Sequence, residues 1–239
     1  MCGIAGYLSE CPIPDGVFEK MVTVLAHRGP DDIALRQFEQ LHVGMQRLAI
    51  NDVKGGTQPL FDESEDVVLI YNGEIYNSPN LRRELSAKGY TFRTHSDGEV
   101  ICHLYHEYGE QLFERLDGMF AVALWVRSEK KLILARDLPG EKPLYYTESG
   151  PGSIAFGSEI RSLEVYLKGQ LTLNRQAVWD FPTFLWVPEP ATVHQEIKAL
   201  PRGHILIVSQ GNITIRPYEN KFGNDVEFDD DESIVEETR

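Results

Sequence analysis

The feature that most limits what this chain can fold into is its large number of short, strand-like segments. Each segment alternates apolar and polar residues or is rich in β-branched residues, and turn-forming residues separate it from the next. We predict ten strands, at residues 3–8, 33–38, 41–50, 67–72, 119–126, 132–135, 143–146, 153–157, 204–209 and 213–217. Strands in this number and at this spacing indicate sheets that are largely antiparallel.

Helix signals are fewer but well marked. Ser78-Pro79 places a cap residue before a first-turn proline, and Lys88-Gly89 ends that helix. Ser96 and Glu99 have capping-box spacing ahead of an apolar segment. Asn174 is predicted to cap a helix over 175–184, and residues 15–26 form a fourth. Because 42% of the 239 residues are hydrophobic, the chain can bury a core, and one α+β domain over residues 2–220 explains these elements.

Charge is concentrated at the end of the chain. The net charge is −14, and residues 225–239 contain eight acidic residues and one basic residue. We interpret this segment as a solvated acidic linker. An acidic surface repels phosphate backbones, so we expect no nucleic-acid partner. No apolar run reaches the roughly 20 residues of a membrane span, and the start MCGIAGYL does not resemble a secretory signal. We therefore expect no membrane association and a cytoplasmic location.

The three cysteines are too sparse for a disulfide framework or zinc-finger spacing, and we expect no metal site. Cys102 lies in an apolar stretch and is expected to be buried and inert. Cys2 is different, because removal of Met1 would give it a free α-amino group. Such a group has a pKa of about 7.7–8.0 and can act as a base for the thiol of the same residue. The alternative is a cysteine that is second in the chain by chance.

Four further positions allow both a structural and a functional interpretation. Asn72-Gly73 is typical of a hairpin turn, but its side-chain amide and backbone N–H could also stabilise an oxyanion. Arg47 stands in an apolar strand, where it either faces solvent or meets a carboxylate. Glu74 and Asp97 could be a solvated charge and a helix cap, or acids of a site.

Nine motifs follow one another along residues 2–220: MCGIAGYL, HRGPDD, QRLAINDVKGGTQPLF, YNGEIYN, HSDGEVI, LDGMFAVALW, ARDLPGEKPLYY, FGSEIRSL and IKALPRGH. In this order they resemble the glutaminase domain of glutamine-hydrolysing asparagine synthetases. That domain is a class II glutamine amidotransferase, a branch of the N-terminal nucleophile hydrolases. The resemblance implies a four-layer αββα sandwich of two antiparallel sheets flanked by helices.

The resemblance also implies a role for each candidate residue. Cys2, after loss of Met1, corresponds to the nucleophile that attacks the glutamine side-chain amide and forms a glutamyl thioester. Asn72 and Gly73 correspond to the oxyanion hole. Arg47 corresponds to the group that holds the α-carboxylate of glutamine, and Glu74 and Asp97 to the acids that hold its α-ammonium.

The segment that lines the glutamine pocket in this family corresponds to Leu48, Ala49, Ile50 and Asn51. At Asn51 a hydrophobic residue is more frequent in the family. The motif HRGPDD is similar to the loop that closes over the substrate.

The same resemblance implies partners outside this sequence. The glutaminase step needs no cofactor, whereas ATP and Mg are expected only in a synthetase domain that would receive the ammonia. No Ser-Gly-Gly-x-Asp-Ser phosphate loop occurs here, so residues 221–239 are expected to be an acidic linker and the start of that missing domain. A homodimer is possible. Two alternatives stay open: the glutaminase half of another amidotransferase, similar to β-lactam synthetase or glucosamine-phosphate synthase, or a catalytically silent regulatory module.

Overall fold

A computed structural model describes residues 1–11, 13–50, 52 and 55–219 of the chain. Its strands form two six-stranded sheets in which every pair is antiparallel. The first has the order β10-β8-β9-β1-β3-β2 and consists of β1 (Gly3–Leu8), β2 (Asp32–Phe38), β3 (Leu41–Arg47), β8 (Tyr145–Gly150), β9 (Ser153–Gly157) and β10 (Lys198–Ala199). The second has the order β12-β11-β7-β6-β5-β4 and consists of β4 (Leu60–Phe61), β5 (Val67–Ile75), β6 (Gly118–Val126), β7 (Lys131–Arg136), β11 (His204–Ser209) and β12 (Asn212–Pro217).

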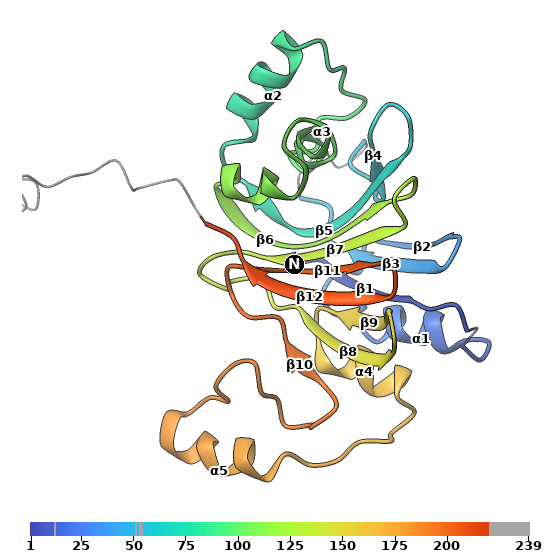
Figure 1. Ribbon diagram of the computed structural model, residues 1–239, viewed down its shortest axis with the longest axis vertical. Helices are drawn as coiled ribbons and strands as arrows, with labels where there is room; N and C mark the ends of the chain where they lie inside the picture. The colour runs from blue at the N-terminus through green and yellow to red at the C-terminus, as the bar shows by residue number, and fades with distance from the viewer. Residues whose placement is uncertain (12, 51, 53–54, 220–239) are drawn as a thin grey trace, which may run out of the picture.

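The helices flank the sheets on both sides (Figure 1). They are α1 (Val17–Thr23), α2 (Ser78–Ala87), α3 (Glu99–Tyr108), the 3-10 helix η1 (Gly109–Arg115), α4 (Ile160–Tyr166) and α5 (Arg175–Phe184).

Three buried clusters define the layers. One lies between the two sheets and includes Ile4 of β1 and Trp125 of β6. A second joins the β4–β12 sheet to α2 and α3, and a third joins the β1–β10 sheet to α1 and α4. The order of layers is thus α1/α4, sheet, sheet, α2/α3, which confirms the predicted αββα sandwich.

The structure has two strands that were not predicted, β4 and β10, and it places β8 at Tyr145–Gly150 where a strand was predicted over 143–146. Four other predicted strands begin or end one residue away from the observed bounds. Two further strand ends differ by three residues, and both lie next to the predicted site. β5 continues past Asn72 to Ile75 and pairs with β6 over its whole length, with Gly73 opposite Phe120. Asn72-Gly73 is therefore not a hairpin turn. A Cβ at Gly73 would lie 2.2 Å from the Met119 carbonyl oxygen, so only glycine fits between these strands.

β3 ends at Arg47 rather than residue 50. The Arg47 carbonyl accepts a hydrogen bond from Asp31 N at 3.0 Å, and Ile50 N then turns back onto the Leu48 carbonyl at 3.1 Å. These bonds bend the chain out of the sheet directly after Arg47.

The predicted helix starts were correct only in part. The Asn174 side chain caps α5 by accepting a bond from Ala177 N at 3.2 Å, as predicted. At α2 the N-cap is Asn77 and not Ser78, and the Asn77 amide instead bonds Arg115 and Asp117. At α3 the N-cap is Gly98, without the side-chain bond expected of Ser96.

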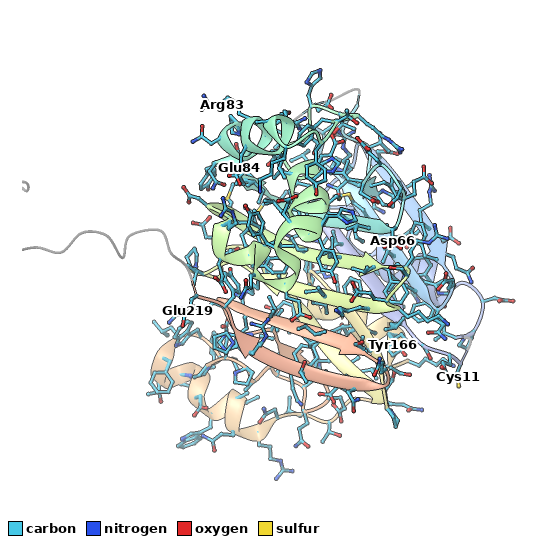
Figure 2. The ribbon with its side chains drawn as sticks, turned by 45° about the horizontal axis from the view of Figure 1, so that its top comes forward. Cys11, Asp66, Arg83, Glu84, Tyr166 and Glu219 are labelled. Carbon is cyan, nitrogen blue, oxygen red and sulfur yellow. The ribbon has the colours of Figure 1, made fainter. Side chains whose placement is uncertain are left out.

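The other two cysteines differ in exposure. Cys102 is completely buried on α3, and burial raises the pKa of its thiol well above the ordinary value. Cys11 is exposed on the loop that follows β1 (Figure 2). No helix in the described ranges is long and apolar enough to cross a membrane. The predicted linker over 221–239 lies outside the described residues.

Candidate functional site

Cys2 stands directly before β1, a central strand of its sheet, and is held by both its thiol and its main chain. Leu48 N donates to the Cys2 sulfur at 3.4 Å, and the thiol donates to the Leu48 carbonyl at 3.6 Å. Arg28 Nε donates to the Cys2 carbonyl at 2.9 Å, and Arg28 Nη1 pairs with Glu159 at 3.0 Å. The candidate nucleophile is therefore fixed from two sides.

A cavity of about 120 Å³ opens at Cys2, where the end of β3 in one sheet faces β5 of the other. Seven of the predicted site residues line it: Cys2, Arg47, Leu48, Ile50, Asn72, Gly73 and Glu74. Met1, Gln58, Tyr71, Ser96 and Lys142 also contribute to its wall. The two sheets thus bring together residues that are far apart in the sequence.

Among the described residues that line this cavity, Asn72 is the one with a buried polar side-chain atom that lacks a hydrogen-bond partner. Its side chain is 2% exposed, and within the part of the chain that the structure describes its Nδ2 has no hydrogen-bond partner. A buried N–H without an acceptor costs about 1–3 kcal/mol, so native proteins rarely leave one unused. The Asn72 amide is available to donate to a group bound in the cavity.

Opposite charges also meet in this cavity. Arg47 is 7% exposed, and its Nη2 donates to the Asp52 carbonyl at 2.9 Å. Glu74 is exposed at the end of β5 and lines the same space. Arg47 therefore does not face solvent as an ordinary surface residue would, and the cavity can offer a cation and an anion to one ligand.

Two predicted pocket residues are bonded to neighbouring segments instead. Among the described residues, Asp97 and Ala49 do not line the cavity. The Asp97 carboxylate accepts hydrogen bonds from the Tyr71 hydroxyl and from Ile75 N, the latter at 2.7 Å, and so holds β5. Ala49 N is bonded to Asp31 at 2.9 Å. Asn51 lies outside the described residues.

Tyr71 remains protonated and able to donate to Asp97. Burial raises the pKa of its hydroxyl well above the ordinary value, and the Asp97 charge raises it further. Gly98 leaves room for this ring, because a Cβ there would lie 2.1 Å from the Tyr71 ring. The start of α3 is thereby packed directly on the strand that carries Asn72.

Sequence reasoning missed three residues that build this site, namely Arg28, Gln58 and Tyr71. The buried Gln58 side chain donates to the Tyr71 carbonyl at 3.0 Å and accepts from Tyr71 N at 2.7 Å, so it extends the pairing of β4 along β5. A glutamine beside a proline in a glycine-rich loop was the available signal. Arg28 belongs to HRGPDD, the motif predicted to close over substrate, and it donates to the Cys2 carbonyl. No cluster of three potential metal ligands occurs in the described ranges.

Comparisons with known proteins show the family to which this sequence is similar. A family profile described as a glutamine amidotransferase domain matches residues 1–219. Asparagine synthetase [glutamine-hydrolyzing] 1 of Bacillus subtilis (strain 168) is 37% identical over 242 residues, which is 99% of this chain and 38% of the relative. Asparagine synthetase [glutamine-hydrolyzing] 2 of Arabidopsis thaliana is 42% identical over 68% of this chain and 28% of its own length.

The structural comparison supports the fold. The glutamine phosphoribosylpyrophosphate amidotransferase of B. subtilis, solved with ADP and GMP, matches 90% of this chain and 49% of its own with a TM-score of 0.66 and 19% identity. The chain spans less than half the length of the curated relatives it matches. With the profile match over nearly all of its described residues, the chain belongs to the glutamine amidotransferase domain family.

Proposed function

We propose that this domain hydrolyses the side-chain amide of L-glutamine through Cys2 and supplies the ammonia for ATP-dependent asparagine synthesis from aspartate. The single observation that carries the proposal is the cavity shared by the Cys2 thiol and the buried Asn72 amide, whose Nδ2 has no hydrogen-bond partner among the described residues. A nucleophile next to a preorganised donor is the arrangement that acyl transfer requires.

The proposed reaction begins when loss of Met1 frees the Cys2 α-amino group. This amine takes the thiol proton while the sulfur attacks the side-chain carbonyl carbon of glutamine. The oxyanion of the tetrahedral intermediate accepts hydrogen bonds from Asn72 Nδ2 and Gly73 N. The C–N bond then breaks, the ammonium of Cys2 returns its proton to the leaving nitrogen, and ammonia departs. Water hydrolyses the thioester with the same amine as base, which releases glutamate.

The charges of the cavity account for the choice of substrate. Glutamine carries an α-carboxylate and an α-ammonium, so Arg47 is the proposed partner of the first and Glu74 of the second. Asp97 contributes by holding β5 and, in the predicted role, by facing the ammonium. A ligand that lacked the α-carboxylate would lose its contact with the buried Arg47, and one that lacked the α-ammonium would lose its contact with Glu74. Discrimination is strongest where the lost contact is to a buried charged group.

The acceptor half of the reaction is proposed from the relatives' names and from their greater length. A synthetase part joined to this domain would use ATP and Mg and receive the ammonia, and the whole protein could be a homodimer. The glutaminase residues need no cofactor for their own step.

The first test is to incubate the Met1-processed protein with glutamine and measure glutamate release, alongside Cys2→Ala. We expect release from the unaltered protein and none from the variant, because the thioester cannot form without the thiol. Equal activity in both, or none in either, would refute the proposal, and the second outcome would favour a silent regulatory module.

The pH profile tests the self-base mechanism separately. Activity should fall as pH drops through the pKa of the Cys2 α-amino group, ordinarily about 7.7–8.0, because only the neutral amine accepts the thiol proton. The measurement is kcat/KM against pH, with N-terminal mass analysis of each sample. Full activity in protein that retains Met1 would contradict the mechanism.

A further inference from the structure

Asp52 follows β3 and bonds both to the residues after it and to the loop before α3. Its carboxylate accepts from Gly55 N at 3.0 Å through Oδ1 and from His95 N at 2.9 Å through Oδ2. Its main-chain carbonyl accepts from Gly56 N at 2.8 Å and from Arg47 Nη2 at 2.9 Å. The φ angle of Asp52 is 43°, a left-handed conformation that aspartate tolerates better than most residues.

These bonds hold one of the groups that orient the Arg47 guanidinium. The carbonyl that accepts from Arg47 belongs to Asp52, whose carboxylate is bonded to Gly55 N. The bond to His95 N then ties Asp52 to the segment that leads into Ser96 and Asp97. Ser96 lines the cavity, and Asp97 holds the strand that carries Asn72 and Glu74. Asp52 therefore connects Arg47, on one wall of the cavity, with the segment that supports Glu74 on the other wall.

We propose that Asp52 is a positioning residue that sets the selectivity of the cavity for the α-carboxylate of glutamine by holding Arg47. It acts through Arg47 and is not proposed to touch the substrate. The inference rests on the proposed glutamine hydrolysis, but it concerns binding of one end of the substrate and not the chemistry at Cys2. Displacement of such a group by about 1 Å is enough to lower efficiency considerably.

A matched control exists elsewhere in the fold. Asp66, on the loop before β5 (Figure 2), also joins two loops through its carboxylate, which accepts from Ser128 N and Ser128 Oγ, both at 2.7 Å. It does not line the cavity at Cys2. Asp66→Ala therefore reports the effect of losing an aspartate-held loop without changing the site.

The experiment compares Asp52→Gly, Asp52→Asn and Asp66→Ala. Glycine keeps the left-handed backbone and removes the carboxylate, whereas asparagine keeps one acceptor oxygen. For glutamine hydrolysis we expect Asp52→Gly to raise KM about tenfold with kcat within about threefold, because Arg47 binds a part of the substrate remote from the reacting carbon. Asp52→Asn should lie between this variant and the unaltered protein, and Asp66→Ala should match the unaltered protein.

A second substrate separates positioning from general damage to the loop. Glutaminamide has an uncharged amide in place of the α-carboxylate, so it gains little from Arg47. Asp52→Gly should lower kcat/KM for glutamine but leave that for glutaminamide nearly unchanged, and so reduce the preference about tenfold. Equal losses for both compounds, or an unchanged KM for glutamine, would overturn the proposal.

Binding measurements keep this test independent of catalysis. In the Cys2→Ala background, calorimetry gives the glutamine Kd with and without Asp52→Gly. A Kd about tenfold weaker supports the positioning role even if the Cys2 mechanism fails. An equal Kd, or no binding of glutamine at all, refutes it.

Discussion

The Asn72 amide is a buried donor without a hydrogen-bond partner in the described structure, and it lines the same cavity as Cys2. If it stabilises the oxyanion, its contribution appears only in the transition state. Asn72→Ala should therefore lower kcat for glutamine by about 10²–10³-fold, the range for loss of one oxyanion-hole donor, and change KM by less than about threefold. Steady-state kinetics of glutamate release measure both values.

Asn212→Ala is the control at the same scale, because Asn212 is an exposed asparagine on β12. Its kinetics should equal those of the unaltered protein. A rise in KM at constant kcat in Asn72→Ala would show instead that Asn72 binds substrate and transition state equally.

At single residues, the sequence identified candidate positions but left their geometry open. It identified Asn72 and Arg47 as candidates but left a turn and a surface charge as alternatives. Pairing of β5 with β6 beyond Asn72 excludes the turn, and the burial of Arg47 excludes the surface charge. Both facts depend on contacts between strands far apart in the chain. The bond between Asp97 and Tyr71 likewise joins residues that lie apart in the sequence.

At the scale of secondary-structure elements, the Glu99 carboxylate holds the start of α3 to the segment that precedes it. Burial alone would raise the pKa of this carboxyl, but the nearby His103 ring and hydrogen bonds from Thr94 Oγ1, Arg93 N and Thr94 N lower it to about 2. The ionised form is thus stabilised by folding. This stabilisation is complete above the pKa of an unfolded glutamate, about 4.3, and is lost as pH falls toward 2.

Glu99→Gln tests this linkage because glutamine keeps the shape and does not titrate. The unaltered protein should be the more stable at pH 7, and its advantage should shrink by up to about 3 kcal/mol between pH 4.3 and 2. Urea unfolding of both proteins at several pH values gives the difference in their free energies of unfolding. The contributions of the other titrating groups are common to both proteins and cancel in this difference. A difference that does not change with pH would contradict the assigned pKa.

Strands were easier to predict than helix starts for a physical reason. Strand patterns follow from alternation, a local property, and β1, β9 and β11 have the predicted bounds. The helix starts were expected to use local caps, but Asn77 bonds Arg115 and Asp117, and Glu99 bonds the preceding loop. At α2 partners distant in the sequence replaced the local cap, and at α3 the Glu99 carboxylate bonds Arg93 N and Thr94 N instead of Ser96.

At the scale of the whole molecule, the strand pattern indicated antiparallel sheets but not which strands are neighbours. The first sheet places β1 between β9 and β3, strands more than 100 residues apart in the chain. The layer order was implied by the resemblance of the motifs and not by periodicity. Alternation assigns a residue to a face of its strand, whereas the layers depend on which faces pack together.

One region of the whole molecule does not join this packing. Helix α5 projects from the sheets (Figure 1), and Trp179 is 76% and Leu185 79% exposed, beside the exposed Phe181, Phe184 and Trp186. Since these side chains bury little area, removing them costs the folded state little. Contiguous apolar surface of this kind promotes association.

The double variant Trp179→Ser, Leu185→Ser should therefore keep the melting temperature within about 2 °C, as small surface effects do, and bind less apolar dye. Light scattering should also show less association at high concentration. Trp125→Ala is the contrast, because Trp125 is 1% exposed between the sheets and its loss should cost about 3–5 kcal/mol. A large fall in melting temperature in the double variant would show that α5 packs on the domain in solution, and unchanged dye binding would show that its apolar face is already covered.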